Sequence, residues 1–385
     1  MKVLSEQPAI LHPMALLRAR HLRSLTQQEL ATAAGLSRQQ IINLEHGAVG
    51  SPTTSTVHSL AVALTVPAHY LTTSPGPLPP VESLHFRGKM RPPVKLVEEL
   101  LVRGEHFERL SERLERNAQP PAVAVPEHRG GDPDAVERAA MACRIDWGLR
   151  TDNPIANVTR LLERAGALVG LFPLSNDYVE AFSWWRRRPF VLCRRGSSSG
   201  SRRRYCLAHE LGHLVMHRHI RSGDRDIEAE ANRFASAFLM PTGAFQREFP
   251  RRASRIDWDG LIEMKQRWGV SIQAILHRAH DLGVITASMY QSADVRISQL
   301  GWRKQEPGEP VAEQPELVPN IVRALRAHGT SVHAIAGSVG FDVQLVDDTI
   351  GVDLHEVHDQ VSDQGDQLMP IATVIDLCER FIKSR

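Results

Sequence analysis

A His-Glu-x-x-His run at residues 209–213 constrains this chain more than any other feature of its sequence. Residues four apart share one face of a helix, so His209 and His213 can present two imidazoles to one metal ion. Glu210 projects about 100° around the helix axis, where it can reach a water molecule held by that ion. The pattern therefore predicts a zinc cofactor with His209 and His213 as ligands and Glu210 as general base. The alternative is a helix with two histidines and no metal.

A catalytic zinc site needs a third protein ligand, and the next predicted helix, Ile227 to Leu239, offers candidates. Glu228 and Asn232 are four residues apart, which suits a carboxylate ligand followed by an amide that orients a histidine ring. Glu230 lies on a different face and is the weaker candidate. His217 stands two helical turns after His209, so we expect it near the ligands rather than on the metal. The predicted ligands are His209, His213 and Glu228, with Asn232 and His217 beside them.

The N-terminal part, between Met14 and Leu71, reads as a compact series of short helices. Capping boxes at residues 26–29 and 37–40 open two consecutive helices, and Gly35 stands in the turn between them. The second helix of such a pair can read base edges in the major groove of DNA. The residues predicted to contact DNA are Gln27 (through a phosphate), Ser37, Arg38, Gln39, Gln40 and Asn43. Because the segment is only mildly basic, a helical protein-docking module is the alternative.

The chain is expected to contain four regions. They are a helix-turn-helix DNA-binding domain (12–72), a linker with an amphipathic helix (73–131), a metal domain with a helical extension (132–302) and an acidic C-terminal helical region (303–385). The linker helix, Val94 to Asn117, should dock onto a domain, since its apolar repeat is too short for a coiled coil.

Three short β-like runs, at 167–172, 180–185 and 189–193, precede the helix that carries His209. Helices dominate the remainder of the chain. We therefore predict a mainly α fold with a small β-sheet (α+β). It would comprise five N-terminal helices, a linker helix, a zincin-like domain and a small helical segment at the C-terminal end.

Charge is unevenly distributed along the chain, although the net charge is only +2. Residues 181–209 carry eight arginines and no acid, whereas residues 306–385 carry 14 acids and 5 bases. Only the first two-thirds of the chain could therefore favour a polyanion. The arginine-rich loops at 186–188 and 202–204 are expected to be solvated edges; attraction of an acidic substrate or DNA is the alternative.

Cysteine usage and the hydropathy pattern indicate the compartment. The four cysteines are far apart and form no CxxC pair, which argues against a disulfide framework or a cysteine-rich zinc site. The first residues lack a secretory-signal pattern, and no run approaches the roughly 20 apolar residues that span a bilayer. We expect a cytoplasmic protein with no membrane partner.

Two further segments have a sequence pattern that predicts a helix, a turn at a glycine and a second helix with an N-terminal cap. In residues 265–283 we expect Ile272 and Ile275 to be buried, Arg278 to point outward, and the segment to pack against the metal domain. In residues 333–351 aspartates would repel phosphate, so a partner-binding or capping module is expected there.

The N-terminal segment resembles the helix-turn-helix of Cro/C1-type (XRE family) regulators. The shared features are TQ-ELA, the turn glycine, and the ending formed by Ile41, Leu44, Glu45 and Gly47. The resemblance implies double-stranded operator DNA as a partner. Because a lone domain of this charge would bind weakly, a homodimer is expected.

The motifs AHELGHLVMH (208–217) and EAEANRFASAFLMP (228–241) resemble those of the ImmA/IrrE family of zinc metallopeptidases. The resemblance covers roughly Asp132 to Trp302. With the N-terminal module, it is similar to regulators in which a Cro/C1-type domain is fused to an ImmA/IrrE peptidase. It implies an endopeptidase that cleaves a repressor, so that stress or mobile-element genes are expressed.

Two other functions stay open at this point. The chain could be a transcription factor whose metal domain senses a ligand or is structural, without proteolysis. Alternatively, the N-terminal domain could recognise a repressor by pairing with its similar domain. The intact Glu210 favours the peptidase, because a purely structural zinc needs no base.

Overall fold

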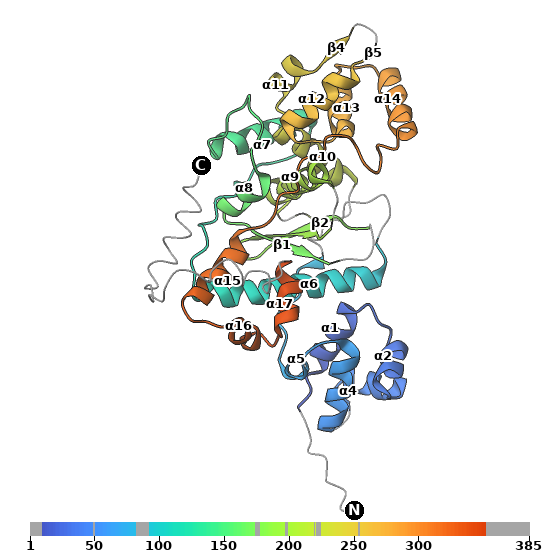
Figure 1. The fold of residues 1–385 in the computed structure, drawn as a ribbon, viewed down its shortest axis with the longest axis vertical. Coiled ribbons are helices and arrows are strands. Elements are labelled where there is room, and N and C mark those ends of the chain that lie inside the picture. Colours follow the sequence, from blue (N-terminus) through green and yellow to red (C-terminus); the bar gives the residue numbers. More distant parts are fainter. Residues whose placement is uncertain are drawn as a thin grey trace, which may run out of the picture.

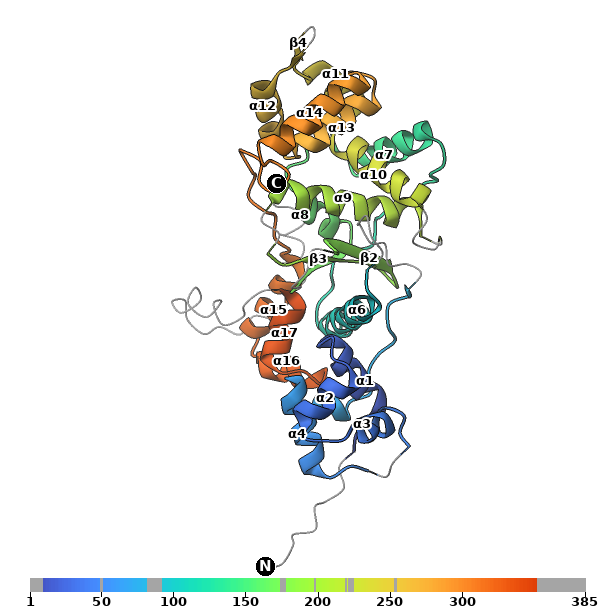
Figure 2. The same ribbon diagram turned by 90° about the vertical axis from the view of Figure 1, so that its right-hand side faces the viewer.

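The computed structural model describes residues 10–48, 51–81, 92–173, 178–196, 199–218, 220, 225–252 and 255–351. The fold is mainly helical with a small three-stranded sheet, which confirms the predicted fold class (Figure 1). The molecule is elongated, with the first five helices at one end and the sheet near the middle (Figure 2). No helix among the described residues combines the length and the apolar character that crossing a bilayer requires.

Five short helices form the N-terminal unit. They are α1 (Pro13–Leu22), α2 (Gln27–Ala34), α3 (Arg38–Glu45), α4 (Thr54–Leu64) and α5 (Ala68–Thr72). Both predicted capping boxes are present, because the Thr26 hydroxyl accepts from the N–H of Glu29 and the Ser37 hydroxyl from the N–H of Gln40. Gly35 ends α2 with a φ of 67°, a left-handed conformation that glycine adopts without strain.

A long helix, α6 (Val94–Glu115), lies between the N-terminal unit and the sheet. The sheet consists of β1 (Leu168–Phe172), β2 (Ala181–Trp185) and β3 (Pro189–Arg194), in the order β1-β3-β2. β1 runs parallel to β3, and β2 runs antiparallel to it. The expectation that the linker helix docks onto a domain is confirmed, since the apolar side of α6 belongs to a core shared with α1 and one face of the sheet.

The opposite face of the sheet is covered by α9 (Gly200–Met216), the helix that carries the His-Glu-x-x-His run. Side chains along a strand alternate between the two faces. Thus Phe182 and Trp184 pack toward α6, whereas Ala181 belongs to the core on the α9 side. Ser183 has the same parity as Ala181, so its hydroxyl lies on the α9 side.

The remaining helices surround α9 and extend beyond it. They are α7 (Pro133–Asp146), α8 (Val158–Arg164), α10 (Arg225–Leu239), α11 (Thr242–Glu248), α12 (Trp258–Trp268), α13 (Ile272–Asp281) and α14 (Ala287–Gln299), with a small hairpin of β4 (Arg251–Arg252) and β5 (Arg255–Ile256). Ile272 and Ile275 are buried as predicted. The outward orientation predicted for Arg278 is wrong: its guanidinium is fully buried and pairs with Glu137 of α7.

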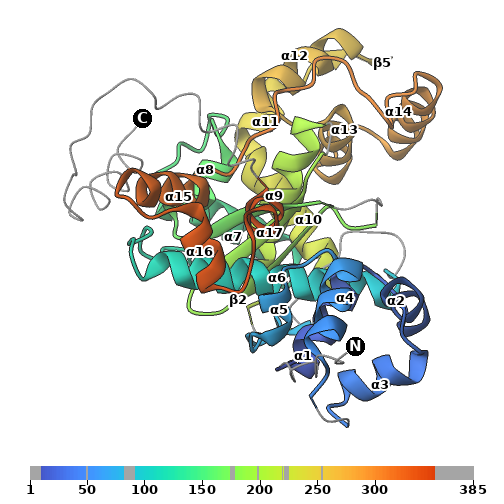
Figure 3. The ribbon, with the colours of Figure 1, turned by 60° about the horizontal axis from the view of Figure 1, so that its bottom comes forward.

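Three helices, α15 (Leu317–Ala327), α16 (Val332–Ser338) and α17 (Val343–Ile350), return the chain to α6 and β1 (Figure 3). They share the core of the N-terminal unit. The acidic segment 352–385, which includes Cys378, lies outside the described residues. Cys143, Cys193 and Cys206 are buried free thiols.

The two arginine-rich segments are solvated edges only in part: Arg187 and Arg202 are exposed, as expected, and residues 202–204 belong to the start of α9 and not to a loop. Arg203 and Arg204 are buried, and Arg204 pairs with the carboxylate of Glu313. Arg186 and Arg188 donate to Glu108 and Glu115 of α6 at 3.0 and 2.8 Å. Their partners come from distant parts of the chain, so these arginines join segments of the fold.

Candidate metal centre and nucleic-acid interface

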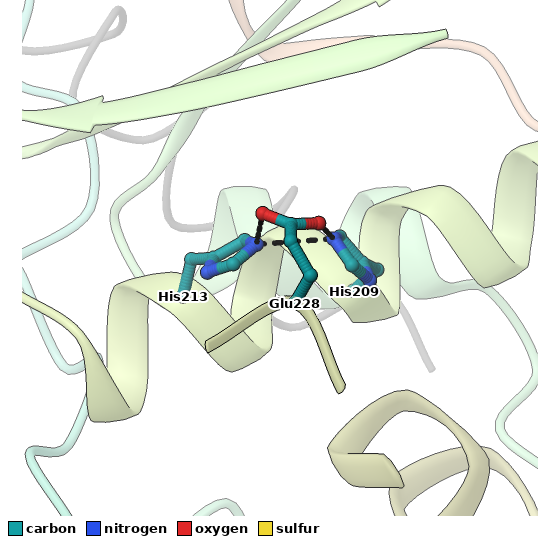
Figure 4. A group of neighbouring side chains, drawn as sticks. All are labelled: His209, His213 and Glu228. Atoms are coloured by element: carbon teal, nitrogen blue, oxygen red, sulfur yellow. Dashed lines mark hydrogen bonds and ion pairs between the residues drawn. The ribbon is translucent and has the colours of Figure 1, made fainter. Parts of the chain in front are cut away.

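Helices α9 and α10 approach each other closely at Gly212. A Cβ atom at this position would lie 3.2 Å from the Cβ of Phe234 and 3.3 Å from the Cα of Ala231. Both contacts are tighter than usual, so glycine allows the two backbones to come together. As a result, the first turn of α10 places Glu228 opposite the histidine face of α9 (Figure 4).

The three predicted ligands meet at one point. The Nε2 atoms of His209 and His213 are 3.0 Å apart, and the Glu228 carboxylate lies 3.3 Å from the first and 3.4 Å from the second. The two histidines are buried, whereas the Glu228 side chain is 25 % exposed. Among the described residues, these three form the one group of histidine, cysteine and acidic side chains placed to hold a metal ion.

This spacing fits zinc. A tetrahedral ion with bonds of about 2.0 to 2.1 Å holds its ligand atoms roughly 3.3 Å apart. Two imidazoles and one carboxylate are also a donor set that catalytic zinc uses, with a further position left for water or substrate.

Asn232 determines which nitrogen of His209 faces the carboxylate. The amide nitrogen of Asn232 donates to the carbonyl oxygen of Glu228 at 2.8 Å, so its Oδ1 is an acceptor. That oxygen lies 3.1 Å from Nδ1 of His209, which must then carry the proton. The lone pair of Nε2 is consequently directed at the point where the three side chains meet.

His213 is oriented by a second chain of hydrogen bonds. Glu230 accepts from Nε2 of His217 at 3.0 Å, and Nδ1 of His217 lies 3.0 Å from Nδ1 of His213. A neutral His217 therefore accepts the Nδ1 proton of His213, which leaves the His213 Nε2 lone pair facing Glu228. The expected position of His217 beside the ligands is thus observed. Glu230, the weaker ligand candidate, contacts His217 and stands outside the ligand group.

Glu210 lies on the sheet side of α9 and is almost completely buried. The hydroxyl of Ser183, on β2, donates to Oε2 of Glu210 at 2.6 Å. Ser183 was not among the residues predicted from the sequence. The available signal was a single hydroxyl residue in the otherwise apolar strand Ala181–Trp185.

The predicted DNA-reading face of α3 lies at the end of the molecule remote from the metal centre. Arg38, Gln39 and Gln40 are exposed there. Gln40 also uses its Oε1 to accept from the N–H of Ser37, so its amide nitrogen is the group available for a base edge.

The other three predicted DNA contacts have local structural partners. Ser37 caps α3, and Asn43 accepts from Gln39 at 3.0 Å. Gln27 donates to the buried carboxylate of Glu45 at 2.9 Å, and Glu45 also accepts from Arg20. The structure therefore groups these side chains on α2 and α3 and presents only part of the set to solvent.

Comparison with protein families agrees with both regions. A model described as "IrrE N-terminal-like domain" matches residues 162–280, and a model described as "Helix-turn-helix" matches residues 16–71. No curated protein matches the chain. The protein is therefore a DNA-binding regulator in which an XRE-type helix-turn-helix domain is fused to an IrrE/ImmA-like domain of the metallopeptidase type.

Proposed function

We propose that this protein is a zinc-dependent endopeptidase and transcriptional regulator that cleaves a repressor protein and thereby derepresses stress or mobile-element genes. The observation that carries the proposal is the convergence of His209, His213 and Glu228, with the buried Glu210 following His209 on the same helix. A structural zinc site would need a fourth strong ligand and no base.

In this proposal, His209, His213 and Glu228 hold the metal, and Asn232 and His217 orient the two imidazoles. When bound, Zn²⁺ would supply Lewis-acid polarisation of the scissile carbonyl and would lower the pKa of a water molecule. The residues fit this ion because both histidines direct the same ring nitrogen to the Glu228 carboxylate.

Glu210 would take a proton from the attacking water and deliver it to the leaving amine. The hydrogen bond from Ser183 holds the Glu210 carboxylate in one orientation. A general base needs such a fixed orientation, because it takes up and releases the proton at one oxygen atom. Burial of Glu210 excludes competing bulk water from the carboxylate.

The substrate would bind as an extended segment next to β2. In the described sheet β2 is an outer strand, with β3 on one side. An outer strand offers main-chain N–H and C=O groups to an incoming peptide. Because Ser183 of β2 contacts Glu210, a peptide paired with this strand would pass close to the proposed base.

The N-terminal domain, residues 12–72, would bind double-stranded operator DNA through Arg38, Gln39 and Gln40, as a homodimer in the cytoplasm. The metallopeptidase-type domain, residues 132–302, would then act on a Cro/C1-type repressor. We propose the same domain limits as those predicted from the sequence, with a linker at 73–131 and a C-terminal region at 303–385.

The test combines metal content with cleavage. Purified full-length protein should contain one zinc per chain and should cut a Cro/C1-type repressor encoded beside its gene. Glu210→Gln should keep the zinc and lose cleavage. If the parent protein contains zinc and binds specific DNA but cleaves no repressor, the peptidase proposal is wrong. The protein would then be a regulator whose metal domain senses a ligand or is structural. Absence of zinc after metal-free handling and reloading would rule out both metal functions.

A further inference from the structure

The last three described helices repeat the arrangement of the first three in α1 to α3. Thr26, Gly35 and Ser37 mark the start, the turn and the second cap of the first unit. Ser331, Gly340 and Asp342 stand at the same spacing in α15 to α17. The helix, glycine turn and capped helix that the sequence of residues 333–351 indicates are α16 and α17, and α15 completes a three-helix unit.

The local geometry of the two units agrees in detail. Ser331 accepts from the N–H of Ala334, as Thr26 does from Glu29, and Asp342 accepts from the N–H of Leu345. Gly340 has a φ of 78°, beside 67° for Gly35.

The hydrogen bond across the turn also recurs. The N–H of Leu36 donates to the carbonyl of Ala31 at 2.9 Å, and the N–H of Phe341 donates to the carbonyl of Ala336 at 2.9 Å. The buried residues coincide as well: Ile335, Ala336 and Val346 are buried where the first unit buries Leu30, Ala31 and Ile41.

The second unit keeps one side chain that could read DNA, the exposed Gln344 at the position of Gln39, and lacks three others. Val343, Leu345 and Asp348 occupy the positions of Arg38, Gln40 and Asn43. Hydrogen-bond donors for base edges are thus replaced by apolar groups and a negative charge, which phosphate repels.

The turn of the second unit is instead seated on α5 and α6. Phe341 is 1 % exposed, and its ring centre lies 4.8 Å from that of His106 and 5.1 Å from the guanidinium carbon of Arg109. Its ring also stacks on Tyr70. The exposed side of the first unit's turn, around Gly35 and Leu36, has no comparable burial.

Three side chains of α5 and α6 bind this turn or the last residue of α16 before it. His69 donates to the carbonyl of Phe341 at 3.0 Å, and Arg109 donates to the carbonyl of Val339 at 3.0 Å. Arg113 donates to the hydroxyl of Ser338 at 2.9 Å. Two main-chain carbonyls at the turn therefore each accept a side-chain hydrogen bond, and the one from Arg109 is charge-assisted.

We propose that residues 317–351 form a second helix-turn-helix unit that has lost DNA binding and binds the DNA-binding domain instead. Its turn holds α5 against α6, while α15 and α17 pack on β1 of the metallopeptidase-type domain. The surface formed by α5 and α6 is thus an interaction site for a helix-turn-helix unit, and residues 317–351 of the same chain occupy it. This inference concerns a region outside the proposed catalytic function and holds whether or not the protein cleaves a substrate.

The docking can be tested by a distance measurement in the full chain. Spin labels at Gln39→Cys and Gln344→Cys, in a Cys378→Ser background, sit on exposed and equivalent positions of the two units. Electron–electron resonance should give one narrow distance distribution. Phe341→Asp should broaden it, and His333→Ala, an exposed change on the same unit, should not.

Arg113→Glu provides a second perturbation that leaves Phe341 and the core of the unit in place, and it should also broaden the distribution. If both Phe341→Asp and Arg113→Glu leave the distribution narrow, the proposed docking contact is wrong. Circular dichroism of each variant shows whether the helices are retained, so a broadening caused by unfolding of the second unit would be recognised and would count against the proposal.

The loss of DNA binding is tested separately, with a duplex selected by the full chain from a random pool. Arg38→Ala combined with Gln40→Ala should weaken binding at least about tenfold and abolish the preference for that duplex. Sequence preference that survives in this variant and disappears on Gln344→Ala would assign DNA reading to the second unit and overturn the proposal.

Discussion

At the scale of single residues, the candidate metal centre is organised by the partners of the histidine rings. Each ring uses Nδ1 for a protein hydrogen bond and directs Nε2 to Glu228. Asn232 does this for His209, and His217 with Glu230 does it for His213. The orientation of the imidazoles is therefore determined by residues that do not belong to the ligand group.

We expect Asn232→Ala to weaken zinc binding by about 10- to 100-fold, because His209 loses the acceptor that holds its ring and tautomer. The measurement is competition with a chromogenic chelator at fixed pH. Asn320→Ala, on α15, is the matched control and should bind zinc as the parent does. Equal affinities for both variants would show that Asn232 does not orient His209.

A second expectation at this scale concerns Glu163 of α8, whose fully buried carboxylate faces the start of α15. Burial raises the pKa of Glu163 from 4.5 to about 8, although Oε1 accepts the N–H groups of Glu316 and Leu317. Between these two values the folded protein keeps a proton that the unfolded chain releases. The free energy of unfolding should therefore fall as pH rises through this window, by up to about 1.4 kcal/mol per pH unit from this group.

Glu163→Gln should remove that part of the pH dependence, because the amide keeps a carbonyl oxygen for the two N–H groups and does not ionise. Urea unfolding of both proteins between pH 5 and 9 measures the difference. Curves that stay parallel over the whole range would contradict a raised pKa for Glu163.

At the scale of elements, the decisive contact is the close packing of α9 on α10. The three proposed ligands come from two helices, so the separation of these helices determines whether Glu228 reaches the histidines. At Gly212 the two helices are in close contact, since an added Cβ would lie 3.2 Å from the Cβ of Phe234 and 3.3 Å from the Cα of Ala231.

We expect Gly212→Val to destabilise the protein by about 1 to 3 kcal/mol and to weaken zinc binding, because the added methyl groups push α10 away. Gly337→Val is the matched control: it also lies in a helix, and a Cβ there meets no heavy atom within 4 Å. Denaturant unfolding and metal titration report the two effects. Similar results for both variants would mean that the cost arises from helix propensity and not from the packing of α9 on α10.

The helix α3 gives a second expectation at this scale. Arg38 is exposed at its first turn, so Arg38→Ala should cost about 1 to 3 kcal/mol of specific DNA binding if it contacts a base edge. Val343→Ala changes the equivalent position of the second unit and should leave DNA affinity unchanged. Fluorescence anisotropy over a range of salt concentrations separates a base contact, which alters sequence preference, from a phosphate contact, which alters the salt dependence.

At the scale of the whole molecule, the two functional regions depend on different cores. The sheet separates them: one hydrophobic core joins the N-terminal unit, α6 and α15 to α17, and the other surrounds α9 and α10. The DNA-reading face and the metal centre lie on opposite sides of this division (Figure 2).

Removal of zinc should therefore abolish cleavage and leave DNA affinity within about twofold of the parent value, because no predicted metal ligand belongs to the core of the DNA-binding unit. Anisotropy measured before and after dialysis against a chelator tests this, with readdition of zinc to restore cleavage. A large loss of DNA affinity that zinc reverses would show that the metal centre and α3 are coupled.

Local sequence patterns determined the helices, their caps and the pair of histidines, because these depend on residues within about four positions of one another. The same reasoning identified Glu228 and Asn232 as neighbours on one helix face. It could not place Ser183, since the contact with Glu210 joins a strand to a helix and follows only from the parity of β2 in the sheet.

The burial of charged side chains and the docking of the last helices follow from the tertiary structure and could not be predicted from local sequence. In the sequence Arg204 and Arg278 resemble surface residues, yet both are buried in the structure. Arg204 pairs with Glu313 and Arg278 pairs with Glu137, and both partners come from distant segments of the chain. Likewise, the sequence pattern of residues 333–351 indicated a helix-turn-helix, but it could not show that Phe341 packs against Tyr70 of α5 and His106 of α6. Local patterns specify elements, whereas ion pairs and docked faces depend on which distant elements the packed core brings together.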